Sequence, residues 1–229
     1  MKMIFTAAVF FLFNLNASAQ NVLFVGDSHS VGPFGKKLDS LLREKGFNVE
    51  TYASCGSIAQ WWVNSKPTTC GYFFRNFEGK TSFGLKADTP VFAELLEKDR
   101  PAFVIVELGA NYANVLSDEF AIEDMSAMAA SIKESGATCF WVTKPDSRKN
   151  AFDIPRILSL TEKAVSPYCK IFDSTKVTRY PQEGGDGVHY SFKEGIPIAE
   201  KWAQEVFKWF SSGGSIESYS EKKSKPEIK

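Results

Sequence analysis

The sequence has few of the residues that build metal and nucleic-acid sites. It holds two histidines and four cysteines among 229 residues, and the lack of a C-x-x-C pair argues against a zinc site. Lysine and arginine number 27 and are balanced by 27 aspartates and glutamates, so net charge gives no attraction to nucleic acid or anionic lipid. Beyond the N-terminal segment, no apolar run approaches the roughly 20 residues of a membrane-spanning helix.

The N-terminal segment has the pattern of a secretory signal peptide. Lys2 precedes an apolar stretch over residues 4–15, and Ala17-Ser18-Ala19 fits an A-x-A cleavage site. The apolar stretch is short for a membrane span, although a retained N-terminal anchor is the alternative interpretation. We therefore expect residues 1–19 to be removed and the protein to be exported, to the periplasm or the medium.

The exported part reads as one domain followed by a tail. Residues 20–212 show no internal repeat and no linker, and their number suits a single core. Residues 213–229 are rich in glycine, serine and lysine without any period, which is typical of a disordered tail. The sequence does not indicate an oligomeric state.

The four cysteines form an even set, and export would permit disulfides. A bond between Cys55 and Cys70 would close a short, aromatic-rich loop, and one between Cys139 and Cys169 would join the starts of two predicted strands. Four cysteines allow three connectivities, and the sequence does not choose among them.

Strand and helix patterns alternate along the domain. Buried-strand runs occur at 22–25, 47–53, 102–109, 138–143 and 170–172, with helical periodicity around 34–42, 118–135, 155–165 and 192–210. This alternation predicts an α/β fold with about five mostly parallel strands covered by helices on both faces. Residues 56–89 break the regularity and are rich in aromatics, so we expect them to pack over the active edge of the sheet.

Ser28 follows the first predicted strand, and ligand sites of open α/β sheets gather at the carboxyl ends of strands. A serine nucleophile needs a base. His29 is adjacent to Ser28, and neighbouring side chains in extended chain point to opposite sides, so His189 is the better candidate. Asp186, three residues earlier, would orient that imidazole. Ser28, Asp186 and His189 then form a predicted catalytic triad.

An acyl-transfer site also needs donors for the oxyanion. The backbone N–H of Ser28 is one candidate, and Gly56 follows the second predicted strand, where a glycine lets the backbone approach a substrate. The side-chain amide of Asn111, after the third strand, is another. Each of these residues alone is also a common turn residue. Their shared position at strand ends favours an oxyanion site.

In this order the residues resemble the SGNH, or GDSL-type, hydrolase family. The resemblance spans the domain and rests on four blocks, namely Gly26-Asp27-Ser28-His29-Ser30, Gly56, Gly109-Ala110-Asn111 and Asp186-Gly187-Val188-His189. It implies a flavodoxin-like three-layer α/β/α sandwich with strand order 2-1-3-4-5, ester hydrolysis through an acyl-serine, and no metal or organic cofactor. The family often has Asp after the block asparagine, where this chain has Tyr112.

The function expected is that of an exported serine esterase that removes short acyl groups, acetyl above all, from carbohydrate such as cell-wall or exopolysaccharide sugars. Trp61 and Trp62 are candidates for stacking on a sugar ring, with lid packing as the alternative, and His29 for contacting substrate or supporting the loop. Other functions left open are a lipase or lysophospholipase, an O-acetyltransferase using the same acyl-serine, and a non-catalytic carbohydrate-binding module.

Overall fold

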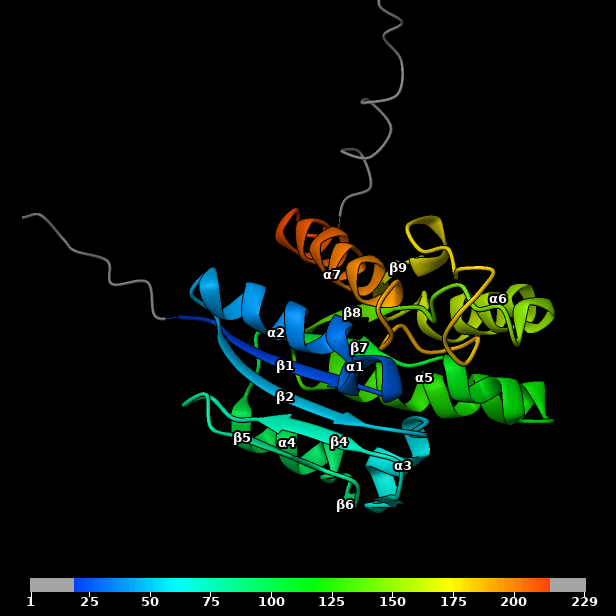
Figure 1. Cartoon of the computed structure of the whole chain (residues 1–229). Helices are drawn as coiled ribbons and strands as arrows, with labels where there is room; N and C mark the ends of the chain where they lie inside the picture. Colours follow the sequence, from blue (N-terminus) through cyan, green and yellow to red (C-terminus); the bar gives the residue numbers. More distant parts are fainter. Residues whose placement is uncertain (1–18, 215–229) are drawn as a thin grey trace, which may run out of the picture.

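A seven-stranded sheet forms the centre of the fold, in the order β5-β4-β2-β1-β7-β8-β9 (Figure 1). The computed structural model describes residues 19–214, so residues 1–18 of the predicted signal peptide and 215–229 of the predicted tail lie outside the described residues. The strands of the sheet are β1 (Asn21–Gly26), β2 (Asn48–Ser54), β4 (Tyr72–Arg75), β5 (Thr81–Gly84), β7 (Phe103–Glu107), β8 (Thr138–Val142) and β9 (Cys169–Phe172).

The parallel part of the sheet has the predicted strand order. β2, β1, β7, β8 and β9 pair in parallel, and these are the five strands expected from the sequence in the order 2-1-3-4-5. The apolar runs of the central strands are buried, with Val22 through Val25 of β1 and Val104 through Val106 of β7 at 0% exposure, because helices cover both faces. All five strands therefore deliver their carboxyl ends to one edge.

The sequence predicts about five strands, but the sheet has seven, because residues 56–89 contribute two more. Within it, β4 pairs antiparallel with β2, and β5 pairs antiparallel with β4, so the hairpin extends the sheet sideways. The turn between them closes through an N–H···O bond of 2.9 Å from Gly79 to Asn76. Phe73 is buried while Tyr72 and Phe74 are partly exposed, a two-residue alternation too short to stand out among so many aromatics.

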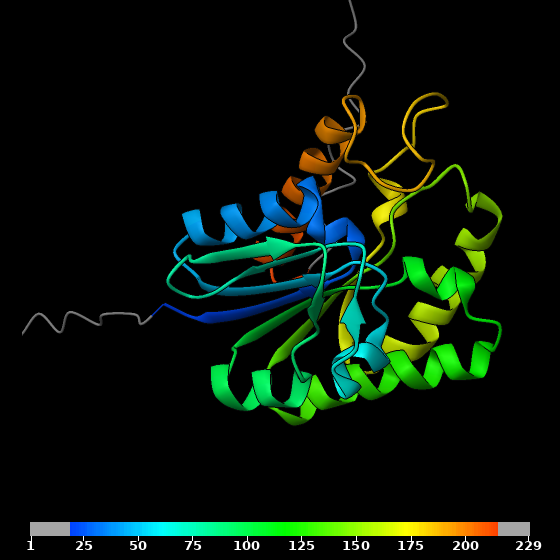
Figure 2. The ribbon, with the colours of Figure 1, turned by 60° about the horizontal axis from the view of Figure 1, so that its bottom comes forward.

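The helices form two layers, one on each face of the sheet (Figure 2). One layer holds α2 (Pro33–Glu44) and α7 (Gly195–Ser211), preceded by the single turn α1 (Ser28–Val31). The other layer consists of α3 (Ala59–Asn64), α4 (Phe92–Asp99), α5 (Asp118–Glu134) and α6 (Ile154–Val165). Short elements complete the fold, namely β3 (Pro67–Thr68), β6 (Ala87–Asp88), η1 (Ala110–Asn114), η2 (Ala151–Asp153) and η3 (Ser174–Lys176).

A buried carboxylate fastens the added hairpin to the rest of the fold. Asp39 of α2 is fully buried and accepts hydrogen bonds from Arg43 at 3.0 Å, from Arg75 of β4 at 2.6 Å and from the Thr51 hydroxyl of β2 at 2.7 Å. Arg43 in turn donates to backbone carbonyls in the hairpin turn. Burying this charge is tolerable because every side of the carboxylate is paired.

Two disulfides are present, Cys55–Cys70 and Cys139–Cys169, which settles the connectivity that the sequence left open. Cys139 and Cys169 are directly opposed in the β8–β9 pair, with Cα atoms 4.5 Å apart. Cys55 follows β2, and Cys70 precedes β4, so their bond ties the added hairpin to the edge where the parallel strands end. Among the described helices, none is both long and apolar enough to cross a membrane.

Candidate active site

Ser28 is the first residue of α1, directly beyond the carboxyl end of β1. Asp27 caps the turn, because its carboxylate accepts the N–H of His29 at 2.9 Å. Gly26 allows the turn to fold back closely, since a Cβ there would lie 2.1 Å from the Ser30 hydroxyl. The chain thereby leaves the sheet abruptly, and the Ser28 hydroxyl is presented at the strand edge.

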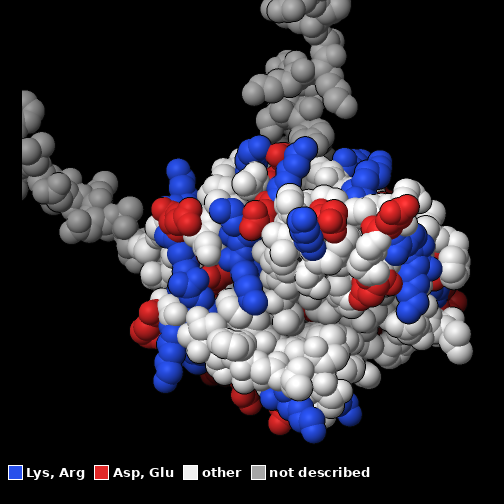
Figure 3. All heavy atoms as spheres, in the orientation of Figure 1, with Lys and Arg blue, Asp and Glu red and all other residues white. Residues whose placement is uncertain are grey.

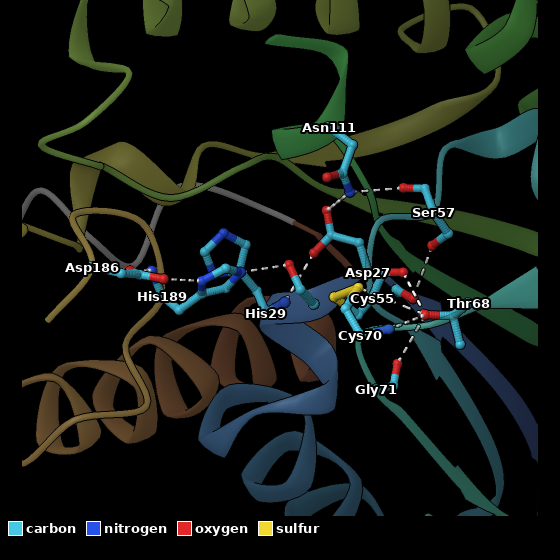
Figure 4. The surroundings of a disulfide bond; sticks show 12 residues. Asp27, His29, Cys55, Ser57, Thr68, Cys70, Gly71, Asn111, Asp186 and His189 are labelled. Atoms are coloured by element: carbon cyan, nitrogen blue, oxygen red, sulfur yellow. Dashed lines mark hydrogen bonds and ion pairs between the residues drawn. A yellow bond between two sulfur atoms is a disulfide. The ribbon is translucent and has the colours of Figure 1, made fainter. Parts of the chain in front are cut away.

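The structure brings the three predicted triad residues together, and Figure 4 shows Asp186 beside His189. Nε2 of His189 lies 2.9 Å from Oγ of Ser28, although 161 residues separate them. Nδ1 of His189 lies 2.5 Å from Oδ2 of Asp186. This arrangement lets the imidazole accept the serine proton while the carboxylate fixes its tautomer.

The loop that carries the base is ordered by its own hydrogen bonds. Oδ1 of Asp186 accepts the backbone N–H groups of Val188 and His189 at 2.9 and 2.8 Å. The Tyr180 hydroxyl accepts the N–H of Gly187 and donates to the carbonyl of His189. Burial acts against ionisation, but the bonds from the His189 ring and backbone prevail and hold the pKa of Asp186 well below its usual range. The carboxylate therefore stays charged beside the imidazole.

Two of the predicted oxyanion donors are backbone groups. Neither the N–H of Ser28 nor that of Gly56 has a hydrogen-bond acceptor among the described residues. Gly56 has a φ of +85°, a conformation that favours glycine, and a Cβ there would lie 3.4 Å from the ring of Trp61. These two N–H groups follow the neighbouring strands β1 and β2 and are available as oxyanion donors.

The third predicted donor, Asn111, is engaged with protein groups. Its Nδ2 donates to the carbonyl of Ser57 at 2.9 Å and to Oδ2 of Asp27 at 3.3 Å (Figure 4). The amide thus joins the loop that holds Gly56 to the turn that holds Ser28. An oxyanion would receive an N–H from Asn111 by replacing the longer of these bonds, the one to Asp27.

Sequence reasoning missed a buried carboxyl pair beneath the nucleophile. Glu107, the last residue of β7, is fully buried and accepts the Ser30 hydroxyl at 2.8 Å, while its backbone carbonyl accepts the N–H of Asp27. Burial raises the pKa of Asp27 to about 6, and burial together with the charge of Asp27 raises that of Glu107 well above its ordinary value. A glutamate inside the otherwise apolar run 103–108 was the available signal.

A buried lysine, also missed, lies close enough to sense the Asp27 charge. Lys144 follows β8, is 3% exposed, and donates from Nζ to the Ser147 hydroxyl and the carbonyl of Pro145. Burial lowers its pKa to about 8. The buried residues beneath Ser28 thus include two carboxyl groups, Asp27 and Glu107, and one amine, Lys144, where apolar side chains would be usual.

His29 lies beside the base without replacing it. Its ring centroid is 5.4 Å from that of His189, and the Trp202 ring meets it edge-on at 6.0 Å. Burial, with a further contribution from the charge of His189, lowers the pKa of His29 to about 3. His29 also lines the cleft. A neutral imidazole in that position can contact a substrate but does not form an ionic interaction with it.

The prediction that Trp61 and Trp62 form a sugar-stacking platform is wrong for Trp62. Trp62 is 0% exposed and belongs to the core beneath α3, where it packs with the α5 side of the fold. Trp61 is partly buried, and its ring approaches Gly56. Adjacent residues of a helix point in different directions, so the pair does not present a shared face.

An open cleft of about 840 Å³ runs past Ser28. Ser28, His29 and His189 lie in it, the Cys55–Cys70 disulfide contributes to its wall, and further lining comes from α2 and α7, namely Pro33, Lys36, Lys37, Ser40, Ala199, Glu200 and Trp202. Its size is typical of small-ligand sites. On the face drawn in Figure 3, charges of both signs are interspersed, and a largely uncharged area lies on the β4–β5 side.

No protein-family model matches the sequence, and no curated protein matches it either. Solved structures do match. A psychrotrophic esterase EstA from Pseudoalteromonas superposes with a TM-score of 0.55 at 13% identity, covering 84% of this chain and 99% of the esterase. A peptidoglycan O-acetylesterase gives 0.54 at 12% identity, with coverages of 86% and 91%.

A GDSL-like lipase from Bacteroides thetaiotaomicron gives a TM-score of 0.50 at 14% identity, covering 82% of this chain and 88% of the lipase. These likenesses extend over most of both chains in each pair. The chain therefore has the three-layer α/β/α fold that these GDSL-type proteins and esterases share.

Proposed function

We propose that the protein is an exported serine esterase that removes short acyl groups, most of all acetyl, from carbohydrate. The observation that carries the proposal is the chain of contacts from Ser28 Oγ to His189 Nε2 at 2.9 Å and from His189 Nδ1 to Asp186 Oδ2 at 2.5 Å. This geometry, in an open cleft and with two free N–H groups nearby, meets the requirements of acyl transfer to serine.

In the proposed reaction, Oγ of Ser28 attacks the ester carbonyl while His189 takes its proton. The N–H groups of Ser28 and Gly56 and the amide of Asn111 stabilise the oxyanion. His189 then protonates the leaving alcohol, which departs and leaves an acyl-serine. Water, deprotonated by His189, attacks the acyl-serine, and the acid is released with Ser28 restored. Asp186 keeps the imidazolium stable in both halves.

Support for a short acyl group and a polar alcohol comes from the cleft. It is open, and lysines, a serine and a glutamate line it together with apolar side chains such as Phe34 and Trp202, a mixture that suits the hydroxyls and the apolar ring faces of a sugar. The likeness to a peptidoglycan O-acetylesterase points the same way. Export is supported by the signal-like N-terminal pattern and by two disulfides. Lipase action on longer chains and acetyl transfer to a sugar hydroxyl are the alternatives to test.

The test is a series of aryl esters of increasing acyl length, together with O-acetylated xylan and peptidoglycan, incubated with wild type, Ser28→Ala and Ser166→Ala. Ser166 is an exposed serine at the end of α6 and does not line the cleft, so its variant is the matched control. We expect turnover of the acetyl substrates and a loss of at least about a thousandfold in Ser28→Ala alone.

Other outcomes would replace the proposal. Turnover that persists in Ser28→Ala, or no turnover at all, contradicts a serine esterase. Rates that keep rising beyond about eight acyl carbons indicate a lipid substrate, because each buried CH₂ adds binding free energy. Acetylated sugar products formed in place of free acetate indicate a transferase. Polysaccharide binding that is unchanged in Ser28→Ala, without turnover in wild type, indicates a binding module.

A further inference from the structure

Tyr112 immediately follows Asn111, at the position where the GDSL-type pattern often has Asp. The tyrosine is 0% exposed and lies in the η1 turn, where its backbone N–H donates to the carbonyl of Gly109. Its hydroxyl is bonded on two sides. It accepts the backbone N–H of Ala59 at 3.1 Å and donates to Oδ2 of Asp124 at 2.7 Å.

These bonds reach the start of α3, which comes three residues after Gly56. The residue before α3, Ile58, offers no side-chain cap, so the first N–H groups of the helix need other acceptors. The Tyr112 hydroxyl takes the N–H of Ala59 at 3.1 Å. The Asp124 carboxylate from α5 accepts the Tyr112 hydroxyl at 2.7 Å, and the backbone of Gln60 helps to stabilise the charge of Asp124. A side chain from outside the helix thus serves as its cap and is held in turn by a second side chain.

The cap also controls where Gly56 lies. Trp61, on the first turn of α3, places its ring 3.4 Å from where a Gly56 Cβ would be, so a shift of α3 moves the wall behind Gly56. The neighbouring Ser57 carbonyl is held by Asn111 at 2.9 Å. Because Asn111 and Tyr112 are consecutive, one turn fixes the Gly56 loop at two points, Ser57 and Ala59.

The hydroxyl is a donor across the accessible pH range. Burial, reinforced by the charge of Asp124, raises the pKa of Tyr112 well above its ordinary value, so the phenol keeps its proton. Burial also raises the pKa of Asp124. The bond from the phenol to the carboxyl oxygen is therefore present whichever protonation state Asp124 has.

We propose that Tyr112, oriented by Asp124, is a positioning residue for the oxyanion site, because it holds the start of α3 and thereby sets the place of the Gly56 N–H. The inference rests on the proposed esterase activity for its catalytic readout. Tyr112 touches no substrate.

The test compares Tyr112→Phe, Asp124→Asn and Asp124→Leu with Tyr52→Phe. Tyr52 also donates to a carboxylate, Glu50, at 2.6 Å, but outside the Gly56 loop, which makes its variant the matched control. For an aryl acetate we expect kcat to fall by about tenfold to a hundredfold in Tyr112→Phe and Asp124→Leu, with KM within about twofold, since a misplaced donor weakens the transition state. Asp124→Asn, which keeps an oxygen acceptor, should stay within about threefold of wild type.

A second measurement separates this inference from the esterase proposal. Amide hydrogen exchange of residues 56–60 should speed up by about tenfold in Tyr112→Phe and stay unchanged in Tyr52→Phe, whatever the activity, because one hydrogen bond to that segment is lost. Unchanged exchange in Tyr112→Phe, or a kcat loss of equal size in Tyr52→Phe, overturns the positioning role. A wild type without turnover but with the exchange change overturns the esterase proposal alone.

Discussion

At the scale of single residues, the site holds two imidazoles in different surroundings. His189 has a charged carboxylate at one ring nitrogen and a hydroxyl at the other. His29, packed against Trp202 and 5% exposed, has neither, and burial keeps it neutral. Their rings are 5.4 Å apart, so a neutral His29 spares an imidazolium at His189 the repulsion of a second positive charge.

This difference predicts a pH effect on stability. The folded pKa of His29 is lowered to about 3 from 6.5, so the unfolded chain binds the proton first, and stability is lost as pH falls below about 6.5. Between pH 7 and pH 5, the free energy of unfolding of wild type should fall by about 2 kcal/mol more than that of His29→Asn. Urea denaturation at the two pH values measures this, and parallel losses in both proteins would contradict it.

The sequence allowed the triad residues to be singled out because a serine, an aspartate and a histidine each follow a recognisable strand or loop pattern. Glu107 and Lys144 could not be assigned to the site in the same way. Their role depends on which side chains meet beneath α1. The sequence of one strand does not predict which side chains of the neighbouring elements it will contact. Trp62 was misplaced for a similar reason, since α3 was not predicted and the direction of its side chains was unknown.

At the scale of elements, the β4–β5 hairpin is the part of the fold that departs from prediction. Its strands are four residues each, and its pairing with β2 depends on contacts far apart in the sequence. Strands this short form few backbone hydrogen bonds, and the ion pairs of Asp39 with Arg43 of α2 and Arg75 of β4 add stabilising contacts. A short antiparallel hairpin of this kind is stabilised more by side-chain contacts with the rest of the fold than by its own strand pairing.

Removing that anchor should destabilise the fold. Asp39→Ala leaves two arginines and Thr51 without their shared acceptor, and we expect a loss of about 3 kcal/mol in the free energy of unfolding. Asp118→Ala is the control, because its pair with Arg156 is about half exposed and should contribute less than about 1 kcal/mol. Equal midpoints of urea denaturation for the two variants would show that the Asp39 cluster is not an anchor.

At the scale of the whole molecule, the layered α/β architecture and the order of its parallel strands were predictable, because both follow from buried runs alternating with helical periodicity. Disulfide connectivity was not, since it depends on which strands become neighbours. The two bonds differ in position. Cys139–Cys169 crosses between β8 and β9, whereas Cys55–Cys70 lines the cleft beside Gly56.

That difference predicts that both double-alanine variants lose stability but that only one of them loses activity. Loss of Cys139–Cys169, with a sequence separation of 30, should cost about 4 kcal/mol of stability, and loss of Cys55–Cys70, with a separation of 15, about 3 kcal/mol. Only the second variant should lower kcat, because Cys55 adjoins Gly56. Urea denaturation and aryl acetate turnover measure the two effects, and a kcat loss confined to the first variant would refute the assignment.

Ser28 directly follows the first strand of the described fold, and His189 lies in the loop before its last helix, 161 residues later. A growing or half-folded chain therefore carries the serine long before the base can reach it. Under the proposed mechanism, such a chain has no activated nucleophile and is not acylated by the esters that it meets. Turnover would then begin only when the loop that carries His189 docks, so activity would require the whole domain to be folded.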